Sequence, residues 1–143
     1  MHNKPTIAIT LGDPCGIGPE VVVKALAHRE VTDWCRPIVV GSLEAVQATV
    51  SMLDSNLTPN VVEGPEGAED SPDVINIIDP ENLEYGHVSL GQLSAEAGKA
   101  SMEWVLRAAE LCSSGQAQAL VTAPVNKAAT RLGGFQDVGH MEV

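Results

Sequence analysis

The residues best suited to chemistry lie in a glycine-rich segment near the N-terminus, Thr10-Leu11-Gly12-Asp13-Pro14-Cys15-Gly16-Ile17-Gly18-Pro19-Glu20. Its glycines permit backbone angles that side chains forbid and let a ligand approach the main chain closely. Pro19 suits the start of a helix, and Glu20 suits the positive end of the helix dipole. The free N–H groups of such a terminus can hold a phosphate or carboxylate. The segment predicts an anion- or cofactor-binding loop, with a tight connection that binds nothing as the alternative; its candidate residues are Gly12, Asp13, Gly16 and Gly18.

A second candidate group follows the apolar run Ala119-Leu120-Val121-Thr122, which predicts a buried strand. Pro124 is expected to start a helix there, and Asn126 and Lys127 come next. Ligands of open α/β sheets bind beyond the carboxyl ends of the strands, so we expect both segments to face one crevice. Lys127 would then act as a point charge for an anionic substrate. The alternative is a solvated surface lysine.

Other chemistries find little support in the sequence. The glycine-rich segment matches neither a P-loop nor the G-x-G-x-x-G dinucleotide fingerprint. The carboxylates of residues 54–73 lack the spacing of a calcium loop, which favours a solvated acidic region. The three cysteines are isolated, with neither metal-ligand nor disulfide spacing. Cys15 is interpreted as a small packing residue in preference to a nucleophile, and no residue of this chain is assigned as a metal ligand.

Short apolar runs alternate with helical patterns, which predicts an α/β fold with a parallel sheet. A stripe of apolar residues at steps of three and four marks the longest helix as core or interface, with Trp104 as a packing residue. Its members are Leu93, Ala97, Ala100, Trp104, Ala108 and Leu111. The expected strands cover residues 7–11, 37–41, 60–62, 74–79 and 119–122, and the expected helices cover 19–30, 43–53 and 92–113.

The composition narrows the class of partner. At 143 residues the chain is one ordinary domain, and its formal net charge of −11 argues against nucleic acid and anionic membrane surfaces. No apolar stretch reaches transmembrane length, and the first residues do not form a signal peptide. A cytoplasmic location is therefore expected, in keeping with the scattered cysteines.

The chain resembles the 4-hydroxythreonine-4-phosphate dehydrogenase family in four segments. They are residues 9–20, Gly91-Gln92-Leu93-Ser94-Ala95-Glu96-Ala97-Gly98, Leu120-Val121-Thr122-Ala123-Pro124-Val125-Asn126-Lys127 and Gly139-His140-Met141-Glu142. The resemblance spans the whole chain but only the N-terminal part of a family member. It implies a three-layer, mostly parallel α/β fold like that of the isocitrate and isopropylmalate dehydrogenases. Residues 1–143 would be the N-terminal portion of this two-domain fold.

The resemblance also implies an activity. The family oxidises a secondary alcohol of a small phosphorylated hydroxy acid with NAD, and decarboxylation of the β-keto acid follows, as in vitamin B6 biosynthesis. A divalent metal such as Zn, Mg or Co polarises the reacting oxygen. The metal ligands and most of the NAD site belong to motifs beyond residue 143, so this chain alone is expected to be inactive. A homodimer is expected as well.

Carried over by position, the resemblance names a few residues of this chain. His140 matches a substrate-contacting histidine, Met141 stands where the family usually has a substrate-contacting threonine, and Asn126 is a further substrate-binding candidate. A thioether cannot donate the hydrogen bond of a hydroxyl, so Met141 bears on substrate identity. Lys127 is the catalytic candidate.

Three alternatives stay open. The Gly-Asp-Pro opening and Asn126 also resemble the branch that oxidises erythronate or threonate 4-phosphate in sugar-acid catabolism. A phosphate-binding acyltransferase of the phosphotransacetylase kind would give a similar sheet pattern. A noncatalytic ligand-binding or assembly domain is the third alternative.

Overall fold

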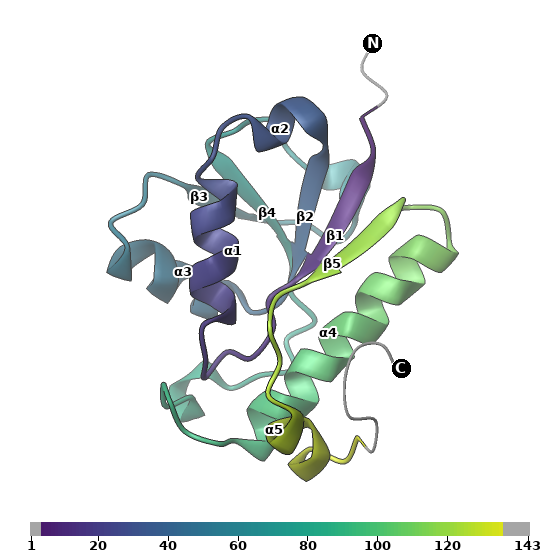
Figure 1. Ribbon diagram of the computed structural model, residues 1–143. Coiled ribbons are helices and arrows are strands. Elements are labelled where there is room, and N and C mark those ends of the chain that lie inside the picture. The colour runs from purple at the N-terminus through teal and green to yellow at the C-terminus, as the bar shows by residue number, and fades with distance from the viewer. Residues whose placement is uncertain (1–3, 136–143) are drawn as a thin grey trace.

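The computed structural model describes residues 4–135, which alternate between strands and helices (Figure 1). The strands are β1 (Thr6–Thr10), β2 (Arg36–Val40), β3 (Thr58–Val61), β4 (Val74–Ile78) and β5 (Ala119–Thr122). The α-helices are α1 (Gly18–Leu26), α2 (Val31–Trp34), α3 (Leu43–Met52), α4 (Ala95–Ser113) and α5 (Lys127–Leu132). Two single turns of 3-10 helix, Pro65–Gly67 and Tyr85–His87, interrupt the longer loops. The expected α/β fold is confirmed.

The five strands form one parallel sheet in the order β3-β4-β2-β1-β5. From β1 the chain winds outward through β2 to β3 and β4, and then returns across the sheet to place β5 on the other side of β1. The winding direction therefore reverses at β1, and such a reversal is the position at which open α/β sheets bind ligands.

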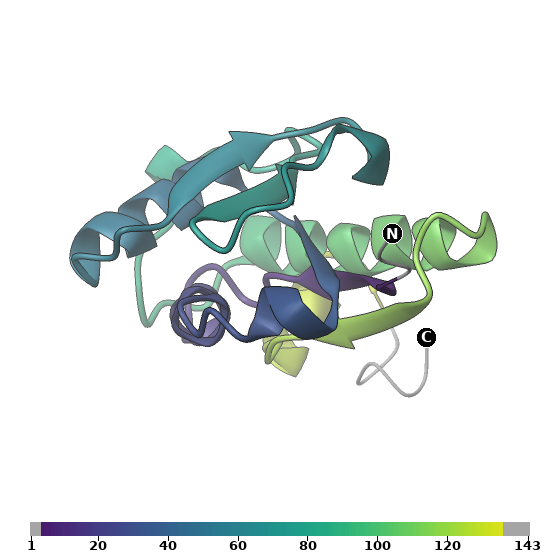
Figure 2. The same ribbon diagram turned by 90° about the horizontal axis from the view of Figure 1, so that it is seen from above.

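Helices cover both faces of the sheet, giving three layers (Figures 1 and 2). Helix α1 packs beside α3 on one face, and the long helix α4 crosses the other face against β1, β2 and β5. The short helix α5 rests on α4.

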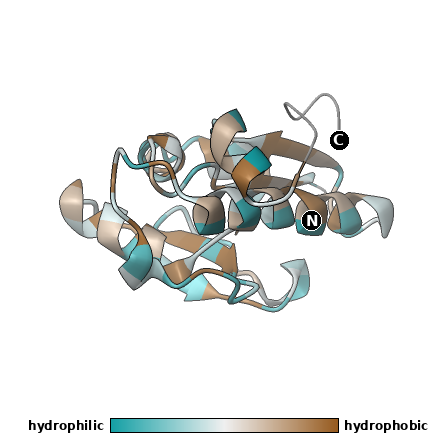
Figure 3. Ribbon diagram, turned by 90° about the horizontal axis from the view of Figure 1, so that it is seen from below, coloured by the Kyte–Doolittle hydropathy of each residue, from teal (hydrophilic) through white to brown (hydrophobic). Residues whose placement is uncertain are grey.

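The core is aliphatic, as the scarcity of aromatic residues requires. Hydrophobic residues concentrate on the strands and on the helix faces turned toward them (Figure 3). The expected stripe of α4 is confirmed from Ala97 to Leu111, all of whose members are fully buried, and Trp104 is a packing residue. Leu93 is the exception: it precedes the helix and is 52% exposed.

Three local expectations were wrong. Helix α1 ends at Leu26 because residues 27–30 are all exposed and offer no apolar face for packing. The helix after β5 begins at Lys127, capped by Asn126, and Pro124 lies in the preceding loop. Strand β5 is not buried: among the described residues it forms an edge of the sheet, and Val121 is 52% exposed.

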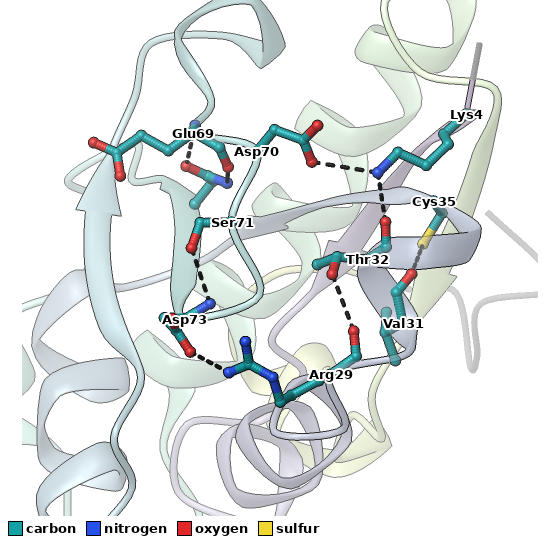
Figure 4. A network of polar contacts seen from close by, with 10 residues as sticks. Lys4, Arg29, Val31, Thr32, Cys35, Glu69, Asp70, Ser71 and Asp73 are labelled. Atoms are coloured by element: carbon teal, nitrogen blue, oxygen red, sulfur yellow. Dashed lines mark hydrogen bonds and ion pairs between the residues drawn. The ribbon is translucent and has the colours of Figure 1, made fainter. Parts of the chain in front are cut away.

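The acidic segment lies at the amino ends of the strands, opposite the glycine-rich loop. There Asp70 pairs with Lys4, and Asp73 pairs with Arg29 (Figure 4). The Lys4 ammonium also donates a hydrogen bond to the Thr32 carbonyl. Among residues 4–135 no cluster of three or more His, Cys, Asp and Glu side chains could hold a metal ion. Asp70 and Asp73 thus connect the loop before β4 to Lys4 and Arg29.

Along residues 4–135, none of the helices combines the length and apolar composition that a bilayer crossing requires.

Candidate functional site at the carboxyl edge of the sheet

The two segments singled out from the sequence meet at one place. Strands β1 and β5 are parallel neighbours, so the loops that follow them leave the same edge of the sheet. The Asp13 N–H donates a hydrogen bond to the Pro124 carbonyl at 2.8 Å, and the Ala123 N–H donates one to the Thr10 carbonyl at 3.1 Å. Both segments therefore leave the same edge of the sheet and are in contact there, whereas the crevice that they were expected to share with Lys127 stays a prediction.

The glycines of the first loop serve mainly the packing of the chain against itself. Gly12 has φ +75°, and a Cβ there would lie 2.4 Å from the Pro124 carbonyl oxygen. A Cβ on Gly18 would lie 2.2 Å from the Leu11 carbonyl oxygen. Gly16 is different because it is exposed, and its nearest obstacle is the Asp13 carboxylate at 3.3 Å. Of the three, Gly16 is the one that presents its backbone to solvent.

Asp13 organises the loop from within. Its side chain is buried, its Oδ1 accepts a hydrogen bond from the Cys15 N–H at 2.9 Å, and its carbonyl accepts one from the Gly16 N–H at 3.0 Å. Burial, and secondarily the Asp13 charge, raise the pKa of the Cys15 thiol above its usual value, although a Ser89 backbone hydrogen bond opposes them. Cys15 is therefore kept as a neutral thiol, in agreement with a packing role.

Helix α1 begins at this loop without a side-chain cap. Its N-cap residue, Ile17, makes no capping hydrogen bond. Helices α3, α4 and α5 are capped instead: Ser42, Ser94 and Asn126 each accept a hydrogen bond from a first-turn N–H. Since an uncapped N-terminus carries unsatisfied donors and partial positive charge, the start of α1 can attract an anion.

The second segment places Asn126 and Lys127 at the start of α5. The Asn126 Oδ1 accepts a hydrogen bond from the Ala129 N–H at 3.0 Å, so its carbonyl end is used as a cap and its amide end remains available. Lys127 is exposed, and no residue among 4–135 engages its ammonium in an ion pair or hydrogen bond. Their roles toward a substrate stay predictions.

The two functions of Asn126 can be separated by substitution. Asn126→Ala is expected to lower the free energy of unfolding by about 1 kcal/mol because the cap is lost. Asn126→Asp keeps a capping oxygen and is expected to unfold like the wild type in urea. If the amide also contacts an anionic substrate, Asn126→Asp should weaken substrate binding, since a donor is replaced by a negative charge. Equal destabilisation by both substitutions would contradict the capping role.

The connection between β4 and α4, residues 79–94, lies over the first loop, which sequence reasoning did not foresee. The Gly91 N–H donates a hydrogen bond to the Cys15 carbonyl at 2.7 Å. The middle of the connection is held by Glu96 of α4, whose carboxylate accepts hydrogen bonds from the Glu84 N–H and from the His87 ring. The Glu84 contact, followed by the His87 contact, lowers the pKa of the Glu96 carboxyl below its usual value.

This connection also forms one wall of a cavity of about 290 Å³ beside the first loop. The cavity is lined by residues of the first loop, of the start of α1, of α3 and of the connection: Pro14, Gly16, Pro19, Glu20, Ala48, Thr49, Met52, Tyr85 and Leu90. The only advance signal for these last two was their place in a long loop that follows a strand.

Thr10, the last residue of β1, is a further residue that the sequence did not single out. It is fully buried beneath the loop, and its hydroxyl oxygen has no hydrogen-bond partner among the described residues. A buried hydroxyl without a partner is costly, which marks the end of β1 as a polar position within the core.

Two candidates cannot be placed. His140 and Met141 lie outside the described residues 4–135, so their expected contacts with substrate stay predictions.

Comparisons with known proteins agree with the resemblance read from the motifs. The chain is 39% identical to the 4-hydroxythreonine-4-phosphate dehydrogenase of Trichlorobacter lovleyi, over 98% of this chain and 42% of that protein. It is also 39% identical to the D-threonate 4-phosphate dehydrogenase of Cupriavidus necator, over 97% of this chain and 41% of that protein. The chain thus spans about two fifths of the length of these relatives.

A solved structure has the same fold. The 4-hydroxythreonine-4-phosphate dehydrogenase from Burkholderia phymatum superposes with a TM-score of 0.94 at 38% identity, over 99% of this chain and 42% of that one. The expected isocitrate dehydrogenase-like fold is confirmed, whereas the division into two domains stays a prediction. The family model of the pyridoxal phosphate biosynthetic protein PdxA matches residues 33–143. With its motifs, its sheet and most of its length in agreement, the chain belongs to the PdxA family.

Proposed function

We propose that this chain forms the substrate-binding N-terminal part of an oxidoreductase that acts on a phosphorylated hydroxy acid. The hydrogen bond from the Asp13 N–H to the Pro124 carbonyl carries the proposal, because it joins the loop after β1 to the loop after β5, which are distant along the sequence. Together they bring the uncapped start of α1 and the lysine that begins α5 to the reversal point of the sheet.

The proposed binding uses two kinds of positive potential. The unsatisfied N–H groups at the start of α1 would donate to phosphate or carboxylate oxygens. The Lys127 ammonium would add a full charge and a charge-assisted hydrogen bond. Both groups act by holding and orienting the anion, so that the alcohol carbon is presented to the oxidant in one pose.

The expected oxidant is NAD, and a divalent metal ion is expected to polarise the reacting oxygen. Residues 4–135 do not fit the metal, because they hold no cluster of three ligating side chains. We therefore assign neither group to the described residues. Decarboxylation, a homodimeric assembly and a cytoplasmic location are likewise part of the proposal and rest on the family resemblance.

The preferred substrate is 4-phosphohydroxy-L-threonine, with D-threonate or erythronate 4-phosphate as the alternative. The relatives named for the first two reactions are equally identical to this chain. All three substrates carry a phosphate and a hydroxy acid, so the loops after β1 and β5 can bind any of them. Family membership favours this reaction class over the acyltransferase alternative.

The activity can be tested in a chimaera in which residues 1–143 replace the matching part of the Cupriavidus necator enzyme. NADH formation is expected with at least one of the three phosphorylated substrates when a divalent metal is present. Lys127→Ala is expected to lower kcat/KM by about 10- to 100-fold, the value of a charge-assisted hydrogen bond. His140→Ala is expected to impair turnover as well.

Lys99→Ala is the matched control, since Lys99 is an exposed lysine on α4. It should leave kcat/KM unchanged. A chimaera that folds but forms no NADH with any of the substrates would refute the proposed reaction. Equal kinetics for Lys127→Ala and Lys99→Ala would refute the role of Lys127.

A further inference from the structure

The connection between β4 and α4, residues 79–94, is fastened to the core through Asn82. The Trp104 indole N–H donates a hydrogen bond to the Asn82 Oδ1 at 2.9 Å, and the Asn82 amide donates one to the Glu103 Oε1 at 2.8 Å. Trp104 is fully buried in the core, whereas Asn82 is half-buried at the surface. Asn82 thus uses both the acceptor and the donor of its amide to hold the connection on α4.

Beyond Asn82, the connection is held on α4 by weaker contacts. The Glu96 carboxylate accepts hydrogen bonds from the Glu84 N–H and the His87 ring, but the His87 side chain is 71% exposed and that of Glu96 is 39% exposed. An exposed ion pair of this kind contributes little. A buried indole N–H that loses its acceptor is costly, because water does not replace the lost hydrogen bond. Asn82 is therefore the contact with α4 whose loss should affect the connection most.

The far end of the connection holds the first loop. The Gly91 N–H donates a hydrogen bond to the Cys15 carbonyl at 2.7 Å. The peptide group that joins Cys15 to Gly16 also uses its N–H, which donates to the Asp13 carbonyl at 3.0 Å. This peptide group is fixed on both sides directly ahead of Ile17, the N-cap of α1. Its orientation therefore helps to set where the unsatisfied N–H groups of α1 point.

We propose that Asn82 is a positioning residue, which holds the connection on Trp104 and thereby sets the first loop and the affinity of the start of α1 for the anion of the substrate. Asn82 acts at a distance, because Tyr85 and Leu90 of the same connection line the cavity beside the first loop and Asn82 does not. The effect on substrate rests on the proposed function. The effect on the loop can be measured without substrate.

Asn82→Leu tests the effect on the loop, since leucine is similar in size but makes neither hydrogen bond. In the 143-residue chain, the protection of the Gly91 amide from hydrogen exchange is expected to fall by about tenfold or more. Asn60→Leu is the matched control: Asn60 is also half-buried, and its amide donates to the Asn76 Oδ1 at 2.9 Å on the distant edge strand β3. It should leave the protection of the Gly91 amide unchanged.

A second pair of variants tests whether the hydrogen bonds themselves are responsible. Asn82→Asp keeps an acceptor for the Trp104 indole but places a like charge opposite the Glu103 carboxylate, so the protection of the Gly91 amide should fall. Adding Glu103→Gln removes that repulsion and supplies a donor to the new carboxylate. The double variant should therefore recover the wild-type protection, which a general packing defect at residue 82 would not do.

The effect on substrate is measured in the chimaera that contains residues 1–143. Asn82→Leu is expected to raise KM for the phosphorylated substrate by about fivefold to tenfold and to leave kcat within about twofold, because binding of the anion is what changes. The double variant should restore KM. An unchanged Gly91 protection in Asn82→Leu, an equal loss in Asn60→Leu, or an unchanged KM in an active chimaera would overturn the inference. A chimaera without NADH formation refutes the proposed reaction instead, and the Gly91 protection still decides whether Asn82 positions the loop.

Discussion

Gly12→Ala is expected to lower the free energy of unfolding by roughly 2–4 kcal/mol and to separate the two loops of the site. A left-handed φ of +75° alone costs a non-glycine residue about 1–2 kcal/mol. The new Cβ would also stand 2.4 Å from the Pro124 carbonyl oxygen, so the backbone around residue 124 must move. Urea denaturation measures the loss, and the chemical shift of the Asp13 amide reports whether its hydrogen bond survives.

Gly115→Ala separates the two contributions. Gly115 has a similar φ of +81°, but a Cβ there would meet nothing within 4 Å. This control should therefore show the conformational cost alone, about 1–2 kcal/mol. If Gly12→Ala costs no more than Gly115→Ala, the loops are not held in contact as described.

Gly98→Ala is expected to destabilise the protein, although the same change usually stabilises a helix. Inside a helix, alanine is normally favoured over glycine by about 1 kcal/mol. Here a Cβ would lie 2.0 Å from the Ala129 carbonyl oxygen, because α5 packs directly on the backbone of α4. We expect a net loss of roughly 2–3 kcal/mol in urea denaturation, as for an overpacked core.

The same substitution should also affect the site, since α5 begins with Lys127. Displacement of α5 should shift the Lys127 amide resonance and weaken binding of a phosphorylated substrate. Lys99→Ala, at an exposed neighbouring position, should change stability by no more than about 0.5 kcal/mol. A stabilised Gly98→Ala variant would show that α5 is free to move away from α4.

Much of the fold could be predicted because short apolar runs in the sequence indicate its strands. β1, β2 and β4 lie within a residue or so of their expected bounds, and Ser42 caps α3 as its residue type indicates. Buried parallel strands and capped helices are encoded locally. A reading of neighbouring residues is therefore enough to find them.

The errors arose where distant contacts decide the local structure. Pro124 has the residue type of a helix start, yet its carbonyl accepts a hydrogen bond from the Asp13 N–H. The helix begins three residues later, after the Asn126 cap. β5 has the composition of a buried strand, but its exposure depends on what lies beside it. Neither the start of α5 nor the exposure of β5 can be predicted from the adjacent residues.

The site was predicted in position better than in detail. The pattern of strand followed by loop placed both corners at the carboxyl edge. It could not show that Gly12 and Gly18 are required by contacts with the chain's own backbone, because Pro124 is more than a hundred residues away from Gly12. The position of the connection 79–94 over the first loop and the burial of the Thr10 hydroxyl also depend on contacts between distant elements, so the sequence did not predict them.

A shared anion site can be measured by an NMR titration of the 143-residue chain with D-threonate 4-phosphate and with 4-phosphohydroxy-L-threonine. We expect saturable shifts of the Gly16, Gly18 and Lys127 amides with one common affinity, reversed by competing inorganic phosphate. Thr32 and Asp70, at the opposite edge of the sheet, should not respond. Shifts confined to one of the two corners, or centred on the opposite edge, would contradict a shared anion site.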